Sequence, residues 1–147
     1  MRPLVSLLLL AVITGCSGPT RTFDVAVRNE LNQPITVWLT KSGPPVEANW
    51  LSPEQLATYA NPPEGKVPGV PVPPGKTAET GKISGHFPAG TEAVLRVYLG
   101  QRSLDELLAT GARNPDRLDI PLQPGRSDLI IKNTTGRLSA EPSPNKL

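Results

Sequence analysis

Residues 23–40 read FDVAVRNELNQPITVWLT and contain the clearest structural signal in this 147-residue chain. Apolar side chains occupy every second position in 23–28 and again in 35–40, which is typical of strands with one buried face. The polar stretch between the two runs ends at Pro34, as expected for a turn. We therefore predict two strands that form a hairpin.

Further runs of the same alternating type occur at 93–99, 118–122 and 129–132, and a weaker one covers 78–86. The chain contains 18 prolines and 13 glycines, and only 4% of its residues are aromatic. Short strands separated by turn residues favour an antiparallel β-sandwich of the immunoglobulin-like or Greek-key type. We predict one domain of this mainly β class at 22–138.

Two short helices are predicted in the connections, near 53–60 and 104–110. Ser52 and Ser103 precede these segments, and each is followed three residues later by Gln or Glu, which is the arrangement of a capping box. Helices of one or two turns are not stable alone in water. We therefore expect the first of them to pack against the sheet, through Leu56.

The segment 62–75 contains six prolines and is predicted to be stiff, extended and poor in ladder hydrogen bonds. Two interpretations remain open for it. It is either a covering loop or edge crossing between strands, or a polyproline-like recognition element for a partner with an aromatic groove. The last residues, 139–147, have little apolar content and are predicted to form a disordered tail.

Trp38 lies on the strand face opposite to the aliphatic residues, and Trp50 precedes the first predicted helix. An exposed tryptophan is a frequent anchor of protein interfaces, so both residues are candidates for a binding surface. For Trp38 the alternative is a second buried layer on the outside of the sheet.

The first eighteen residues have the layout of a secretory signal peptide, with Arg2 followed by an apolar run and then small residues. The apolar run, 4–13, would reach roughly 15 Å as a helix, which is half of a hydrocarbon core of about 30 Å. A spanning helix is therefore disfavoured. The only cysteine of the chain, Cys16, follows directly after Gly15.

The sequence Ile13-Thr14-Gly15-Cys16 resembles the lipobox of bacterial lipoproteins. The resemblance implies a leader at 1–15, signal-peptidase cleavage between Gly15 and Cys16, and a diacylglyceryl thioether on Cys16, followed by a tether at 16–21. Two or three acyl chains exceed the marginal membrane affinity of a single chain. In this family an Asp after the Cys favours the inner membrane. Ser17 at that position therefore implies the outer membrane, facing the periplasm, if the organism has two membranes.

Charge gives little support to a nucleic-acid partner. Removing the leader takes away Arg2 and leaves 14 basic and 13 acidic side chains. This balance argues against a phosphate-binding footprint or a polybasic membrane patch.

With Cys16 modified, no thiol is left for a disulfide or a thiolate metal site. We expect no cofactor and no metal.

Catalytic motifs are not complete in this sequence. Gly75-Lys76-Thr77 resembles the end of a phosphate-binding loop, but five residues separate it from Gly69 instead of four, and three of them are prolines without an N–H. His86 is the only histidine, and we interpret it as an ordinary surface imidazole. The remaining catalytic route is a carboxylate pair, and the local candidates are Asp105 with Glu106 and Asp116 with Asp119.

These observations predict a membrane-anchored envelope lipoprotein whose sandwich binds a partner or gives structural support, and which is not an enzyme. The alternatives are an accessory lipoprotein of an envelope assembly or secretion machine, and a carboxylate-dependent hydrolase or accessory domain. The hydrolase would need two carboxylates that converge in a pocket. The assembly role would be favoured by exposed tryptophans or an open sheet edge.

Overall fold

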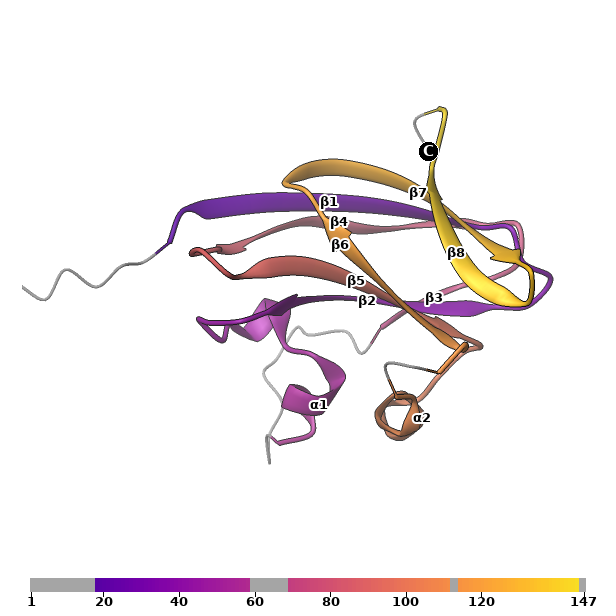
Figure 1. The fold of residues 1–147 in the computed structure, drawn as a ribbon, viewed down its shortest axis with the longest axis horizontal. Coiled ribbons are helices and arrows are strands. Elements are labelled where there is room, and N and C mark those ends of the chain that lie inside the picture. The colour runs from indigo at the N-terminus through magenta and orange to yellow at the C-terminus, as the bar shows by residue number, and fades with distance from the viewer. Residues whose placement is uncertain (1–17, 59–68, 112–113, 146–147) are drawn as a thin grey trace, which may run out of the picture.

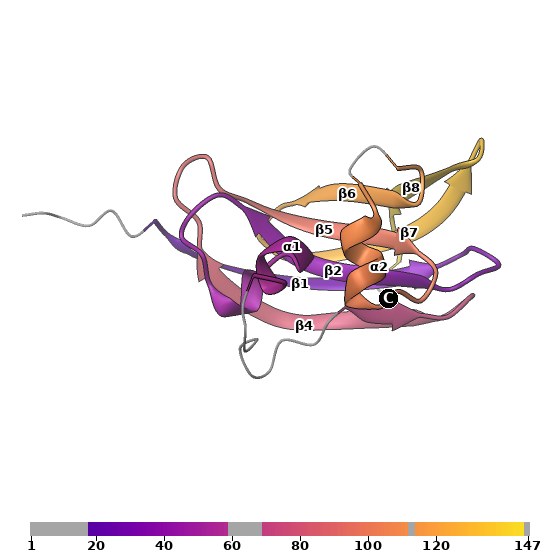
Figure 2. The same ribbon diagram turned by 90° about the horizontal axis from the view of Figure 1, so that it is seen from below.

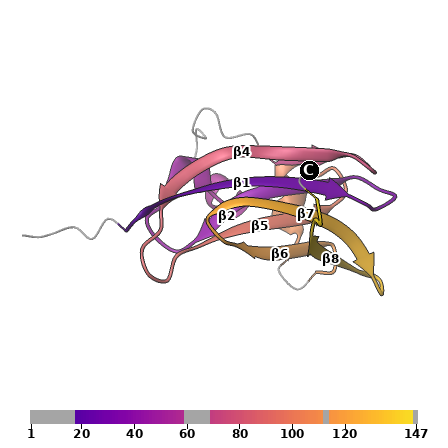
Figure 3. The ribbon, with the colours of Figure 1, turned by 90° about the horizontal axis from the view of Figure 1, so that it is seen from above.

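The computed structural model describes residues 18–58, 69–111 and 114–145, which form two four-stranded sheets packed face to face (Figure 1). Sheet A has the strand order β4-β1-β7-β8, and sheet B has the order β3-β2-β5-β6. The two layers are seen edge-on in Figure 1, and Figure 3 looks down onto sheet A. The strands are β1 (Thr20–Asn29), β2 (Ile35–Ser42), β3 (Val70–Val72), β4 (Thr77–His86), β5 (Glu92–Leu99), β6 (Arg117–Leu122), β7 (Gly125–Thr134) and β8 (Arg137–Pro142).

The predicted mainly β sandwich is confirmed, and all five of the clear strand predictions lie inside observed strands. The weaker run forms β4, an edge strand of sheet A. One pairing is parallel, because β1 and β7 run in the same direction with Val25 opposite Ser127. All the other pairings are antiparallel.

The hairpin predicted from 23–40 is not formed. β1 lies between β4 and β7 in sheet A, whereas β2 lies between β3 and β5 in sheet B. The connection at 30–34 therefore crosses from one sheet to the other. Both strands bury their alternating apolar residues in the interior between the sheets. The same alternation is expected for two strands of a hairpin and for two strands joined by an arch from one sheet to the other. Alternation alone therefore does not distinguish them.

The main core lies between the sheets and is built from the inward-facing side chains that the alternation predicted. Val27 and Leu95, for example, are completely buried. A second, smaller core lies on the outer face of sheet B, where α1 and α2 cover it (Figure 2). Its buried members are Trp38, Leu51, Leu56, Tyr98 and Leu107.

Both predicted helices are present at the predicted capping boxes, and both are short. The helical elements are η1 (Ala48–Trp50), α1 (Pro53–Leu56) and α2 (Leu104–Ala109). Ser52 accepts a hydrogen bond from the backbone N–H of Gln55, and Ser103 accepts one from that of Glu106. These boxes satisfy N–H groups that a helix start leaves without partners.

The connections divide between two ends of the sandwich. The proximal end is where the chain enters at Thr20, which pairs with His86 of β4. The distal end is where β1 finishes and β2 begins (Figure 1). The proximal connections are 43–47, 87–91 and 123–124, and the distal ones include 30–34, 73–76, 100–103 and 135–136.

Two predicted boundaries are wrong. The tether was expected to reach residue 21, but β1 already begins at Thr20. The tail was expected to be disordered from residue 139, but β8 extends to Pro142 and pairs with β7. Edge pairing depends on backbone hydrogen bonds and not on apolar side chains, so the polar composition of the tail did not reveal it.

Half of the proline-rich segment, 62–68, lies outside the described residues. The described remainder contains β3, a three-residue edge strand that pairs only with β2. Pro71 has no backbone N–H to donate. An edge strand tolerates this, because it has a partner strand on one side only. This agrees with the edge-crossing interpretation for that part of the segment.

Candidate binding surface

The two tryptophans do not form an exposed surface. Trp38 is 2% exposed and Trp50 is 1% exposed. They also lie in different cores, Trp38 on the outer face of sheet B and Trp50 in the main core between the sheets. Each indole N–H donates to a backbone carbonyl, that of Leu51 at 2.8 Å and that of Ser84 at 3.0 Å. Both side chains therefore stabilise packing, as the buried-layer alternative for Trp38 predicted.

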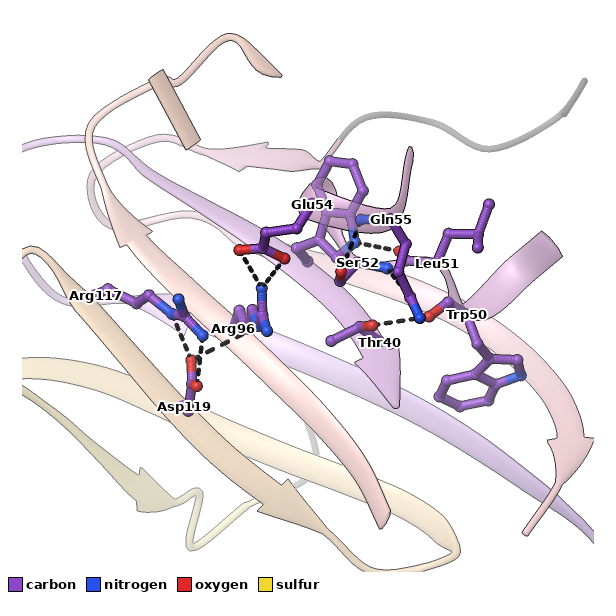
Figure 4. Close-up of polar contacts among 10 residues, drawn as sticks. Thr40, Trp50, Leu51, Ser52, Glu54, Gln55, Arg96, Arg117 and Asp119 are labelled. Atoms are coloured by element: carbon purple, nitrogen blue, oxygen red, sulfur yellow. Dashed lines mark hydrogen bonds and ion pairs between the residues drawn. The ribbon is translucent and has the colours of Figure 1, made fainter. Parts of the chain in front are cut away.

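Hydrogen bonds to sheet B fix the position of the segment from η1 to α1 (Figure 4). Thr40 Oγ1 of β2 donates to the carbonyl of Trp50 at 2.7 Å, and Trp38 binds the next carbonyl along. The capping box then holds the helix start, with Ser52 N–H donating to Gln55 Oε1 at 2.9 Å. This places Glu54 in the first turn of α1, above the outer face of β5.

A strip of alternating charges lies beside α1, and we call its four residues, Glu54, Arg96, Asp119 and Arg117, the charged strip (Figure 4). Arg96 Nη1 donates to both carboxylate oxygens of Glu54, at 3.0 and 2.7 Å. Arg117 makes a bidentate pair with Asp119 at 2.8 and 2.7 Å. Arg96 Nε lies 4.0 Å from Asp119, so the four charges are connected across β5 and β6.

Two polar atoms beneath this strip are buried without a hydrogen-bond partner in the described structure, Arg96 Nε and the hydroxyl of Tyr98. An unsatisfied buried polar group costs about 1–3 kcal/mol, so such atoms are rare in native proteins. Burial raises the pKa of Tyr98, and the guanidinium of Arg96 beside it, through polar contact and charge, opposes that rise only in part. The phenol therefore remains neutral and keeps its donor.

In the charged strip, the carboxylates are exposed to solvent, whereas the arginine side chains are largely buried. The side chains of Glu54 and Asp119 are 47% and 41% exposed, whereas that of Arg96 is 17% exposed. Burial alone would raise the pKa of Glu54, but its own N–H, Ser52 and Arg96 together hold it below the ordinary value. Glu54 is thus charged at neutral pH. The exposed carboxylate oxygens of Glu54 and Asp119 have lone pairs that can accept hydrogen bonds from a protein partner.

A second polar cluster lies at the proximal end and was not found from the sequence. Lys41 has a side chain that is only 2% exposed, and its ammonium group forms an ion pair with Glu47. Glu47 also accepts from the backbone N–H of His86 at 3.1 Å and lies 2.9 Å from its Nδ1. Gly85 leaves the necessary space, since a Cβ there would lie 2.4 Å from Trp50 Nε1. Lys41 and His86 are 45 residues apart, and neither belongs to a sequence motif.

The local carboxylate pairs do not converge on one another. Asp119 binds Arg117, whereas Asp116 lies 3.6 Å from Arg102. Glu106 accepts from the N–H of Ser103 at 2.7 Å as part of the capping box. Within the described residues, no group of three or more His, Cys, Asp and Glu side chains could hold a metal ion.

Cys16 and Gly15, predicted as the lipid attachment and cleavage residues, lie outside the described part of the chain. Their roles stay predictions. Among the residues that the structure describes, no helix is long and apolar enough to cross a membrane.

Comparisons with known proteins give one structural similarity of note. No family model matches the sequence, and no curated protein matches it either. Among solved structures, the chain is similar to the T6SS lipoprotein TssJ1 from Pseudomonas aeruginosa, with a TM-score of 0.40 and 15% identity over 87% of this chain and 100% of that one. A TM-score of 0.40 at this identity assigns neither family nor function.

Proposed function

We propose that this protein is a lipid-anchored, non-enzymatic accessory protein of the cell envelope that binds a protein partner. The observation that carries the proposal is the sequence Ile13-Thr14-Gly15-Cys16, which ends two residues before Gly18, where the described structure begins. Acylation of Cys16 would attach the folded sandwich to a membrane with almost no intervening chain. With Ser17 after the cysteine, the proposed site in a two-membrane organism is the outer membrane, on its periplasmic side.

The charged strip is the proposed partner surface. Its two carboxylates are about half exposed and each already fixed by an arginine, so they are oriented before a partner arrives. Fixed acceptors lose little conformational entropy on binding, and this favours recognition of Arg or Lys side chains and of backbone N–H groups. Arg96 Nε and the Tyr98 hydroxyl, which make no hydrogen bond within the described residues, lie beneath the same surface.

Binding is favoured over carboxylate catalysis by the way these acids are held. Glu54, Asp116 and Asp119 each lie beside an arginine. For Glu54, Arg96 helps to hold the pKa below its ordinary value, whereas a general acid needs its pKa raised. The arrangement therefore supports an accessory role in an envelope assembly better than hydrolysis.

The anchor is tested by labelling cells with palmitate and separating their membranes. We expect label in the wild-type protein and none in the Cys16→Ser variant, which should accumulate as uncleaved precursor. Equal label in both proteins would contradict the proposal.

The partner surface is tested by recovering the acylated protein with its partners from envelope membranes. Glu54→Lys should lose a partner that the wild type retains. Glu79→Lys is the matched control, because Glu79 is also half exposed and paired with an arginine, but lies in sheet A. Retention of every partner by Glu54→Lys, or equal loss in both variants, would contradict the charged strip as the binding surface.

A further inference from the structure

The chain is fixed against the proximal end from Gly18 onward. A Cβ at Gly18 would lie 2.2 Å from the backbone nitrogen of Pro88, so the two segments are in close contact. The carbonyl of Pro19 accepts from the N–H of Phe87 at 3.0 Å, and Thr20 then pairs with His86. The chain that leads to the anchor is therefore part of the sandwich at this point.

The remaining connection to Cys16 is very short. Consecutive Cα atoms are about 3.8 Å apart, so two residues place the Cα of Cys16 no more than about 7–8 Å from that of Gly18. The polar layer on each side of a bilayer is about 5–8 Å thick. Acyl chains on Cys16 would thus bring Gly18 and Pro88 into, or directly onto, the headgroup layer.

The proximal connections have a composition that suits this position. The connections 43–47, 87–91 and 123–124 contain one charged residue, Glu47, which is paired with Lys41, and Val46 is 59% exposed. Distal connections carry charges, for example Glu30 and Lys76. Placing neutral turns in a headgroup layer avoids the cost of desolvating a charge. The charge of Lys41 is already paired with Glu47 beneath this surface.

A cavity of about 240 Å³ opens at the same end. Phe23, Phe87 and Leu122 contribute buried apolar side chains to its lining, and Arg21 and Glu92 are exposed members of it. Arginine forms strong charge-assisted hydrogen bonds to phosphate. Arg21 is three residues from Gly18, within reach of the lipid phosphates that would surround the anchor.

We infer that the proximal end of the sandwich is a membrane-contacting surface, and that its partner is the headgroup layer of the bilayer that holds Cys16. This inference rests on the proposed anchoring at Cys16. β1 leads away from that end over ten residues, so the distal end stands about 30 Å farther from the bilayer. The contact fixes which parts of the molecule are presented to soluble partners.

The test uses the acylated protein in vesicles of phosphatidylethanolamine and phosphatidylglycerol. Because acylation blocks Cys16, one introduced cysteine is the only free thiol and can carry a fluorophore. Ala89→Cys and Val46→Cys label the proximal end, and Asn32→Cys is the matched distal control on an exposed turn. A nitroxide attached to a lipid headgroup then serves as the quencher.

We expect several-fold stronger quenching at positions 89 and 46 than at position 32. Equal quenching at all three positions, or the strongest at position 32, would overturn the membrane contact. The intact mass of each labelled protein distinguishes the two proposals. An acyl mass on Cys16 with equal quenching overturns the contact alone, whereas the absence of an acyl mass overturns the anchoring and the contact together.

Discussion

The proximal and distal ends of the sandwich are each held together by one buried cluster, but the two clusters differ in their chemistry. At the proximal end, the rings of Phe23, Trp50 and Phe87 meet with centroid distances of 4.9–5.4 Å. The ion pair of Lys41 with Glu47 lies beside them, with the ammonium 5.3 Å from the ring centroid of Phe87. This end combines apolar packing with a charged, titratable contact.

The distal end depends on one neutral side chain. Asn29 is completely buried, and its amide donates to the carbonyls of Gln33 at 2.9 Å and Val72 at 2.8 Å. Its Oδ1 accepts from the N–H of Leu31 at 2.9 Å. These bonds link β1 of sheet A, the crossing connection and β3 of sheet B. Acid should therefore weaken the proximal end, where the ion pair titrates, and leave the contacts of the neutral Asn29 at the distal end intact.

The largest effect is expected at the aromatic cluster. Phe87→Ala removes a ring that touches both other aromatics and should lower the free energy of unfolding by about 3–5 kcal/mol. Urea unfolding followed by tryptophan fluorescence measures it, because Trp50 reports on this cluster. Phe87→Leu is the control and should lose clearly less. A loss below about 1 kcal/mol for Phe87→Ala would show that the rings do not hold the proximal end.

The next effect is expected at the distal end. Asn29→Ala leaves the buried carbonyl of Val72, the part-buried carbonyl of Gln33 and the N–H of Leu31 without their partner, and we expect a loss of about 2–4 kcal/mol in the free energy of unfolding. Asn32→Ala, on the exposed part of the same connection, should change it by less than about 0.5 kcal/mol. Chemical denaturation of both variants is the measurement. Equal stabilities would remove Asn29 as the link between the sheets.

The titratable contact gives a prediction about pH. Burial alone would raise the pKa of Glu47, but hydrogen bonds from Lys41 and His86 hold it below the ordinary 4.5. A lowered folded pKa means that the contact stabilises the fold above about pH 4.5, and that this stabilisation is lost as the pH falls through the folded value. Glu47→Gln should therefore be less stable than the wild type at pH 7, with a difference that shrinks below pH 4.5.

The control for this pH prediction is a variant at the distal end of the sandwich. Asn29→Ala should show a stability difference from the wild type that stays constant over the same range, because the amide does not titrate. Unfolding curves at several pH values measure both differences. A difference for Glu47→Gln that does not change with pH would contradict the titratable contact.

The smallest effect is expected between the two ends, in the charged strip. Glu54→Gln breaks the exposed ion pair with Arg96 and should change the free energy of unfolding by about 0–1 kcal/mol. Thermal unfolding of the purified variant measures it. A loss above about 2 kcal/mol would assign Glu54 to the support of the fold and not to a binding surface.

Local patterns predicted most of the elements but not how they are joined. Alternation identified β1 and β2, and the capping boxes at Ser52 and Ser103 identified both helices. The pairing of β1 with β4 and β7 depends on contacts between residues distant in sequence, and alternation contains no information about them. The short tail strand β8 was missed for another reason, because an edge strand pairs through its backbone and its polar composition gives no signal.

The candidate site was less predictable than the fold. Arg96 lies 42 residues from Glu54, and Lys41 lies 45 residues from His86, so neither cluster has a local sequence signature. Trp38 was found from its position on the polar side of a strand, but its environment depends on where α1 packs. Only the proposed anchor is a local motif, since cleavage and acylation would act on consecutive residues.

The intact mass of the protein extracted from cell membranes tests the central claim most directly. The account predicts a chain that begins at Cys16 and carries the added mass of a diacylglyceryl group on that residue. A chain that begins at Met1, or at any other residue, with an unmodified Cys16 would contradict it.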